Sequence, residues 1–466
     1  MMLNLIDYNI DYSLSDNLSI DYLSQNKLLP LLEENLSILV GTSKKEQDLD
    51  KLISLFNKPI KLVYFDEKEM SFELQHIELK RCLYKYASLS LVNIDVMNEN
   101  SYIIIFMEKL FKFCVLNNVS DIHFEALDSS VVIRLRIDGE LNQIFRFKLE
   151  LFPLISSIIK YFGNLDISQK RIPLNGRFSQ KINDLTYDIR ISTMPTIYGE
   201  SVVLRILDNG NIKKDIDNIG FEENVLSVIR KTLRLTQGLV LVTGPTGSGK
   251  TTSLYSMINS LNNTNKKIIT IEDPVEYKLE GVMQVNVNNE INLNYQTVLK
   301  NILRQDPDIL LIGEIRDSES LQIAIQASLT GHLVIATLHT NNSVETITRL
   351  LDLKAEPYLI ASTLKIVLSQ RLVRILCPYC KKKDELTNKY KAVGCNKCSY
   401  VGYKNRQVVS EILEIDDTLS NMISNKDGME KIKLHLKDIH FETLKDNGMK
   451  LVTNGITTLD EYYSKV

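Results

Sequence analysis

A glycine-rich loop between an apolar run and a helical stretch constrains the fold of this chain more than any other feature. Residues 244–252 read Gly-Pro-Thr-Gly-Ser-Gly-Lys-Thr-Thr, follow the apolar residues 239–242 and precede the helical pattern of residues 253–259. This order predicts a buried strand, a tight turn and a helix, which is the context of a phosphate-binding loop. Glycines let backbone N–H groups point at an anion, and the helix N-terminus adds partial positive charge. The predicted nucleotide-binding residues are Gly244, Pro245, Thr246, Gly247, Ser248, Gly249, Lys250, Thr251 and Thr252.

Two residues of the loop have chemical roles in such a site. Lys250 is expected to reach the β- and γ-phosphates of a nucleoside triphosphate, and the hydroxyl of Thr251 is expected to bind Mg²⁺. The alternative is a glycine-rich turn without a ligand. The strand and helix patterns on both sides of the loop favour nucleotide binding over this alternative.

Two acidic residues follow apolar runs that are typical of strands. Residues 267–271 lead into Glu272, and residues 308–313 lead into Glu314. Ligands of open α/β sheets lie at the carboxyl ends of the strands, so each carboxylate is a candidate for holding Mg²⁺ or polarising an attacking water. A third run precedes His339, which we expect to sense the γ-phosphate at the same edge, with a packing role as the alternative.

Two cysteine pairs have a spacing close to that of a zinc site. Cys377 and Cys380 are separated by residues 381–394 from Cys395 and Cys398. In a compartment that keeps thiols reduced, such pairs predict a tetrahedral four-cysteine site for structural Zn²⁺. Redox chemistry at one pair and unpaired structural thiols are the alternatives.

The length of 466 residues predicts two to four domains. Residues 1–95 alternate short apolar segments with a helical pattern and are expected to form a small N-terminal α/β docking domain. In residues 96–208 arginines recur on strand-like segments, so one surface of this second domain is expected to meet an anion, although a solvated face gives the same pattern. A polar linker is placed at residues 209–218. The nucleotide-binding domain is expected to span residues 219–466 and to include a zinc-binding lobe at 371–410.

The composition argues against some classes of function. A formal net charge of −3 and a pI near 6.2 give no general reason to bind nucleic acid. No run approaches the roughly 18 apolar residues that a membrane-spanning helix needs. The first residues lack the basic start of a signal peptide, so we expect a cytoplasmic protein.

Several blocks, taken in order, resemble one protein family. Residues 272–276, Glu-Asp-Pro-Val-Glu, are similar to its aspartate box, residues 313–317, Gly-Glu-Ile-Arg-Asp, to its Walker B motif, and residues 330–340 to its histidine box. The other matching blocks are residues 120–125, 136–139, 170–173, 176–178, 192–195, 199–200 and 370–372 and the four cysteines. From about residue 120 to its end, the chain resembles the secretion ATPases that drive type II secretion and type IV pilus assembly, including competence systems.

The resemblance implies an α/β fold in which a RecA-like P-loop core follows a PAS-like α+β domain that contributes arginines to bound nucleotide. Arg190 and Arg205 lie on matching blocks and take that role by analogy. By the same analogy, Glu272 activates water and Glu314 supports Mg²⁺ and water, although the residues alone do not separate the two acids. The chain departs from the family at Asn175, where an acid is usual, and in the short gap between the cysteine pairs.

The implied function is that of a hexameric cytoplasmic ATPase that binds ATP, Mg²⁺ and structural Zn²⁺ and powers the assembly of pilin or pseudopilin fibres. Its expected partners are further copies of itself, an inner-membrane platform protein that keeps it peripheral to that membrane, and a membrane-anchored recruitment protein at residues 1–95, with no nucleic acid. Rival functions are a pilus retraction ATPase, a DNA-translocating motor and a nucleotide-binding scaffold. The N-terminal domain and the cysteines argue against retraction, the acidic balance argues against DNA, and the intact site residues argue against the scaffold.

Overall fold

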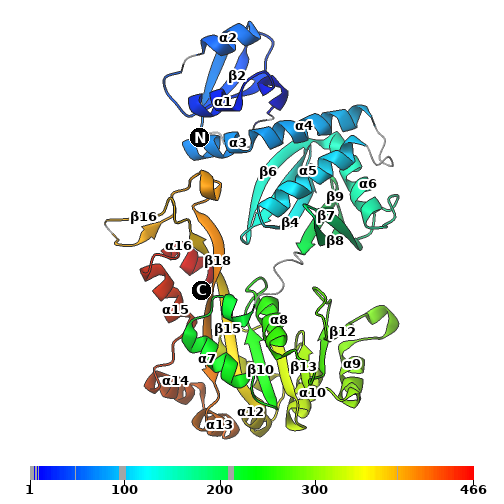
Figure 1. Cartoon of the computed structure of the whole chain (residues 1–466), viewed down its shortest axis with the longest axis vertical. Helices are drawn as coiled ribbons and strands as arrows, with labels where there is room; N and C mark the ends of the chain where they lie inside the picture. The colour runs from blue at the N-terminus through cyan, green and yellow to red at the C-terminus, as the bar shows by residue number, and fades with distance from the viewer. Residues whose placement is uncertain are drawn as a thin grey trace. The chain divides into compact units, whose positions relative to one another are not determined.

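The computed structural model describes residues 5, 8, 10–47, 49–93, 101–207, 215–385 and 387–466. The chain divides into two compact units, whose elements are labelled in Figure 1. One unit holds residues 1–209, 377–382 and 391–404, and the other holds residues 210–376, 383–390 and 405–466. The cysteine-bearing segments therefore group with the first unit, although the sequence places them between strands of the second.

The first unit begins with a small three-stranded sheet and short helices. The strands β1 (Leu28–Glu33), β2 (Ile38–Thr42) and β3 (Ile60–Tyr64) lie in that order, with β1 antiparallel and β3 parallel to β2. The helices are α1 (Ile20–Asn26), α2 (Asp50–Phe56) and α3 (Glu67–Gln75). The alternation of apolar segments and a helical pattern expected at this end of the chain corresponds to alternating strands and helices. The helical pattern that begins at Asp48 in the sequence becomes a helix from Asp50, and Asp48 lies outside the described residues.

A six-stranded antiparallel sheet follows in the same unit. Its order is β6 (Glu140–Lys148), β5 (Ser130–Ile137), β4 (Val119–Ala126), β9 (Gly199–Leu207), β8 (Leu185–Thr196) and β7 (Leu174–Ile182). The helices of this part are α4 (Ile77–Val92), α5 (Tyr102–Leu116) and α6 (Phe152–Phe162). The turn at Asp138-Gly139 joins β5 to β6 and has positive φ at both residues, as a type I′ hairpin turn requires.

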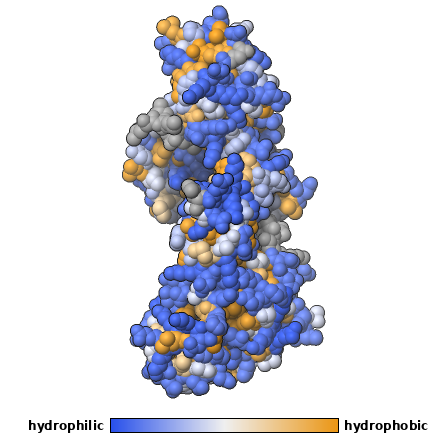
Figure 2. Space-filling view, turned by 90° about the vertical axis from the view of Figure 1, so that its left-hand side faces the viewer, coloured by the Kyte–Doolittle hydropathy of each residue, from blue (hydrophilic) through white to orange (hydrophobic). Residues whose placement is uncertain are grey.

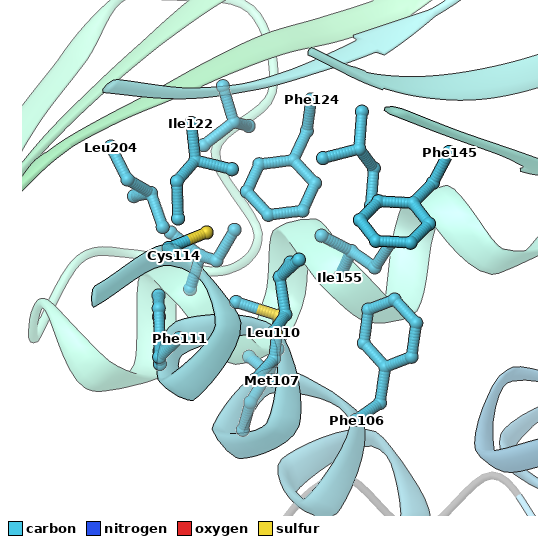
Figure 3. Packing of buried hydrophobic residues seen from close by; sticks show 14 of the residues in the cluster. Phe106, Met107, Leu110, Phe111, Cys114, Ile122, Phe124, Phe145, Ile155 and Leu204 are labelled. Carbon is cyan, nitrogen blue, oxygen red and sulfur yellow. The ribbon is translucent and has the colours of Figure 1, made fainter. Parts of the chain in front are cut away.

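One face of the six-stranded sheet packs against α5. Figure 3 shows side chains of this helix, among them Phe106 and Leu110, gathered with Ile122 and Phe124 of β4 in one hydrophobic core. From Ile122 onward every second residue of β4 is buried, so the alternate residues of the strand lie on the other face of the sheet. Apolar and polar residues alternate along the strand, so the apolar side chains face the core and the polar side chains lie on the opposite face of the sheet.

The second unit is built on a seven-stranded sheet. Its order is β12 (Met283–Asn286), β11 (Ile268–Glu272), β13 (Ile309–Ile312), β14 (Leu333–Leu338), β10 (Gly238–Thr243), β15 (Leu364–Leu376) and β18 (Tyr403–Glu414). The strands from β12 to β15 in this order run parallel. Strands β10, β13 and β14 are buried along their whole length, which explains their continuous apolar runs.

Helices of the second unit follow the strands along the chain. Those of the sheet region are α7 (Glu223–Thr232), α8 (Lys250–Leu261), α9 (Tyr295–Ile302), α10 (Ser318–Leu329), α11 (Ser343–Asp352) and α12 (Pro357–Thr363). The C-terminal helices are α13 (Asp417–Ser424), α14 (Met429–Asp438), α15 (Leu444–Thr453) and α16 (Leu459–Lys465). Part of the expected linker belongs to this unit, since Ile216 is buried in its core. Residues 209–214 of that linker lie outside the described residues.

None of the helices in the described part of the chain is both long and apolar enough to cross a membrane. The face of the molecule in Figure 2 is largely hydrophilic, with apolar residues in scattered groups. Single exposed apolar residues are normal on protein surfaces and need no partner to explain them.

A buried ion pair joins α6 to β9 in the first unit. Lys160 Nζ lies 2.6 Å from Glu200 Oε1, and the two side chains are 1% and 4% exposed. Lys160 also donates to the carbonyl oxygen of Gln169 at 2.6 Å, and Ser156 Oγ donates to Glu200 Oε2 at 2.9 Å. A buried pair of this kind contributes little net stability, but removing one partner leaves an uncompensated charge in the interior.

Replacing Lys160 by methionine should therefore lower the free energy of unfolding by about 3–5 kcal/mol, because Glu200 then lies buried without its counter-charge. Urea denaturation of the purified chain measures the change. The matched control is Lys181→Met, since Lys181 pairs with Asp184 on the surface and the pair is largely exposed. The control should leave stability nearly unchanged, and equal effects of the two substitutions would contradict the role of the buried pair.

Candidate active site

The carboxyl ends of four parallel strands bring together four predicted catalytic residues, Lys250, Glu272, Glu314 and His339. β10 leads into the glycine-rich loop, β11 ends at Glu272, Glu314 follows β13 and His339 follows β14. β13 pairs with β11 on one side and with β14 on the other, so the strand that precedes His339 lies beside the strand that precedes Glu314. These ends border one cavity of about 450 Å³. The predicted residues that line it are Thr246, Gly247, Gly249, Lys250, Thr251, Thr252, Glu272, Glu314 and His339.

Three glycines give the loop its shape. Gly244, Gly247 and Gly249 have φ values of 148°, 79° and 88°, a region that side chains disfavour. A Cβ at Gly244 would lie 2.5 Å from the carbonyl oxygen of Gln370, so this position needs glycine for space as well. Two predicted residues, Gly244 and Pro245, line a smaller cavity beside His339. Ser248 is buried.

Lys250 is the first residue of α8, and its side chain is hydrogen-bonded to the loop. Its Nζ donates to the carbonyl oxygens of Gly244 at 2.7 Å and Pro245 at 3.0 Å. Burial lowers the pKa of Lys250 to about 8, against the opposing effect of the Glu314 carboxylate. The ammonium group is therefore charged at neutral pH but close to its titration range, and it is the cation that a phosphate in this cavity would meet.

Gln370 of β15 supports the loop from the neighbouring strand. It is 1% exposed; its Nε2 donates to the carbonyl oxygen of Ser248 at 2.8 Å, and its Oε1 accepts from Ser253 Oγ at 2.9 Å. One side chain thus joins the last turn of the loop to the first turn of α8. In the sequence Gln370 stands out only as part of a block that resembles a family, and no spacing rule points to this contact.

The Glu272 carboxylate is held by three donors. The residue is 4% exposed, and its Oε1 accepts from Thr270 Oγ1 at 2.6 Å and from Gln284 Nε2 at 3.2 Å. Its Oε2 accepts from the hydroxyl of Tyr255. The donors come from β11, β12 and α8, so only the fold brings them to one acid. Sequence reasoning therefore missed all three of them.

The Glu314 carboxylate lies between an arginine and a histidine. Arg316 Nε donates to Glu314 Oε2 at 2.7 Å, and His339 Nε2 lies 3.2 Å from Glu314 Oε1. The same arginine reaches Asp273 Oδ2 at 3.4 Å. His339 therefore contacts the acid, while phosphate sensing by His339 stays a prediction. Arg316 was missed as a site residue, although it lies inside the block that resembles a Walker B motif.

The residues of this cavity fit a magnesium nucleotide. Lys250 supplies a cation for phosphate oxygens, and the exposed Thr251 supplies a hydroxyl. Two carboxylates, Glu272 and Glu314, supply hard oxygen atoms that suit Mg²⁺ or accept a proton. Because both acids line the cavity, their position alone does not assign the base.

The four cysteines predicted as zinc ligands form one cluster in the first unit. Their Sγ atoms all lie within 4.8 Å of one another, with Cys377 to Cys395 at 3.9 Å and Cys380 to Cys398 at 3.8 Å. Tetrahedral Zn²⁺ with Zn–S bonds of about 2.3 Å places its sulfurs about 3.8 Å apart. The backbone N–H of Gly402 donates to Cys398 Sγ at 3.2 Å. The cluster therefore fits a closed metal site without a position for substrate.

Arginines form a row across the polar face of the six-stranded sheet. The strand register places Arg177, Arg190, Arg205, Asp121 and Arg136 opposite one another on neighbouring strands. Asp121 is buried, accepts from Arg205 Nε at 2.9 Å and lies 3.5 Å from Arg136 Nε. The strand alternation thus collects arginines on one face, while a contribution of Arg190 and Arg205 to bound nucleotide stays a prediction.

Comparison with known proteins places the chain in a family. Residues 96–464 match the family model described as Type II/IV secretion system protein. The chain is 41% identical over 362 residues to the Type II secretion system ATPase E of Vibrio cholerae, which covers 74% of this chain and 72% of that protein. It is 37% identical over 391 residues to the Type IV pilus assembly ATPase PilB of Myxococcus xanthus, covering 79% and 69%. A crystal structure of the pilus retraction motor PilT with bound ADP matches at a TM-score of 0.54 and 26% identity, over 77% of this chain and 96% of that chain.

The matched region contains the glycine-rich loop, both acids, the cysteine cluster and the arginine row. The relatives that are similar over most of this region are named as ATPases. Over 77% of the chain, the fold is likewise similar to that of solved ATPase structures. The chain is therefore an ATP hydrolase and a member of the Type II/IV secretion system protein family.

Proposed function

We propose that this ATPase works as a cytoplasmic homohexamer that powers the assembly of pilin or pseudopilin fibres in a type II secretion, type IV pilus or competence system. The observation that carries the proposal is the single cavity that combines a phosphate-binding loop with two strand-end carboxylates. Similarity to relatives named for secretion and pilus assembly supports the same role.

In this proposal each residue of the cavity has one task in ATP hydrolysis. Lys250 binds the β- and γ-phosphates, and the hydroxyl of Thr251 binds Mg²⁺. A bound Mg²⁺ would neutralise part of the phosphate charge. Glu272 orients the attacking water and accepts its proton. Glu314, held by Arg316 and His339, supports the magnesium ion and the water.

Arg190 and Arg205 complete the proposed site from the six-stranded sheet, which we assign as the PAS-like domain of the family. Charge on the transferring phosphoryl group needs cations to stabilise it. Arginines on a separate domain make hydrolysis depend on the arrangement of two domains, which lets a motor convert hydrolysis into movement. The row of arginines on one face of the sheet supports this assignment.

The proposed partners follow from the family. An inner-membrane platform protein receives the motion and keeps the ATPase peripheral to that membrane. A membrane-anchored recruitment protein binds residues 1–95, and structural Zn²⁺ binds the four cysteines. No nucleic acid is part of the proposal, because the formal net charge of the chain is −3.

A pilus retraction ATPase is the second candidate, since the PilT motor shares the fold. The identity to that motor is 26%, against 41% and 37% to the secretion and pilus assembly ATPases. The higher identity favours assembly. The sequence identities reported above give no such support to a DNA-translocating motor. Such a motor would show ATP turnover that DNA stimulates and that depends steeply on salt.

Substitutions in the cavity test the assignment of roles. Lys250→Ala should abolish ATP turnover and weaken ATP binding, because the cation for the phosphates is lost. Glu272→Gln should lower turnover at least about 100-fold and retain ATP binding, because the amide keeps the shape but accepts no proton. Phosphate release and titration with a fluorescent ATP analogue measure the two effects. Parental turnover in Glu272→Gln together with loss in Glu314→Gln would make Glu314 the base.

Binding of ATP should weaken as the pH rises above neutrality. Because the pKa of Lys250 is about 8, its positive charge is present below that pH and is lost above it. The Kd for ATP should rise about tenfold between pH 7 and pH 9, as the protonated fraction falls by the same factor. Lys250→Arg is the matched control, since its guanidinium stays charged and its Kd should not follow this titration. A constant Kd in the parent would contradict the role of Lys250.

Metal analysis under reducing conditions should find about one zinc ion per chain, since four thiolates complete one tetrahedral shell. Cys395→Ser should lower the zinc content, because the shell loses a ligand. Cys82→Ser should keep it, since Cys82 lies outside the cluster. A parent chain without zinc would rule out the metal site.

A further inference from the structure

Tyr255 is a buried residue on the helix that begins with the phosphate-binding lysine. It lies on α8, five residues after Lys250, and is 1% exposed. Its ring meets that of Tyr277 edge-on, with centroids 4.3 Å apart and planes at 77°. Its hydroxyl donates to Glu272 Oε2 and accepts from the backbone N–H of Glu276 at 3.4 Å. Tyr255 thus connects the Lys250 helix to the acid at the end of β11.

One oxygen of the Glu272 carboxylate can accept a further hydrogen bond. Each oxygen of a carboxylate accepts about two hydrogen bonds. Counted over the described residues, Oε1 receives two, from Thr270 and Gln284, whereas Oε2 receives one, from Tyr255. The remaining acceptor position is therefore on Oε2, the oxygen that Tyr255 holds. A water that Glu272 activates has to pass its proton to that position.

We propose that Tyr255 is a positioning residue that fixes Glu272 Oε2 as the oxygen that accepts the proton of the attacking water. This inference rests on the proposed role of Glu272 as the base. In the step, the water oxygen bonds to the γ-phosphorus and its proton passes to Oε2. The bond from phosphorus to the bridging oxygen breaks, and its electron pair leaves with ADP.

Tyr255 donates its hydrogen bond without losing its own proton. Burial, together with the nearby charge of Glu272, raises the pKa of the Tyr255 phenol well above its usual range. The hydroxyl therefore remains a donor at every pH at which the enzyme works. It orients the carboxylate and does not compete with Glu272 as the proton acceptor.

One helix carries both the phosphate-binding lysine and the tyrosine that holds the acid. Lys250 and Tyr255 are about 7.5 Å apart along the axis of α8. Thr270 and Gln284 hold the other oxygen of Glu272 from β11 and β12. The two oxygens of the carboxylate are therefore held from different elements, and Tyr255 alone of these three donors holds Oε2.

Tyr255→Phe tests the proposal, because phenylalanine keeps the ring and its contact with Tyr277 and removes only the hydroxyl. We expect kcat for ATP hydrolysis to fall by about ten- to a hundredfold, the effect of losing one hydrogen bond to a charged group. The KM and the Kd for ATP should change less than about twofold, since binding does not use Glu272. In the Glu272→Gln background the same substitution should cause no further loss.

Tyr277→Phe is the matched control. It removes a hydroxyl from the neighbouring ring, and that hydroxyl forms no hydrogen bond with Glu272 within the described part of the chain. Its kcat should equal that of the parent. Thermal unfolding and ATP titration show that each variant is folded, so a lower kcat in Tyr255→Phe with intact ATP binding reports on catalysis.

The outcomes separate this inference from the proposed function. A parental kcat in Tyr255→Phe, with Glu272→Gln inactive, would overturn the positioning role and leave the ATPase function intact. A raised KM with parental kcat in Tyr255→Phe would overturn it as well, because the hydroxyl would then serve binding. Parental turnover in Glu272→Gln would remove the base itself, and the positioning role with it.

Discussion

The parallel ladder of β11, β13, β14, β10 and β15 is the constraint on which the candidate site depends. Because these strands run in one direction, their carboxyl ends meet at one edge of the sheet, and residues as distant as Lys250 and Leu372 line one cavity. The central strands are apolar and buried throughout, so they carry no chemistry themselves. Most reactive groups therefore belong to the last residue of a strand or to the residues that follow it.

The two acids of the cavity differ in how they are held. Glu272 is buried and receives hydrogen bonds from neutral donors, whereas the Glu314 side chain is 24% exposed and bonds an arginine. Neutral donors fix a carboxylate and leave its charge available, while a guanidinium neutralises much of it. This difference favours Glu272 as the base and Glu314 as the residue that organises the surrounding groups.

The loop, its strand and the turn at Asp138-Gly139 could be predicted from the sequence because their signals are local. Glycine positions, apolar runs and turn residues act over a few neighbours. The contacts of the loop and of the acids could not be predicted, because they join segments that no periodicity relates. Gln370, which supports the loop, lies 122 residues from Ser248, and Gln284 reaches Glu272 from another strand. The grouping of the cysteine segments with the first unit has the same origin. The roles of Arg190 and Arg205 came from resemblance and remain proposals.

The contact between Gln370 and the loop shows that the phosphate-binding loop is not a self-contained module. Its last turn takes a hydrogen bond from a strand that arrives much later in the chain, and its first glycine lies against the backbone of that same strand. A loop grafted onto another sheet would keep its glycines and lose this support. In this protein the conformation of the phosphate-binding loop therefore depends on β15 as well as on β10 and α8, which it joins.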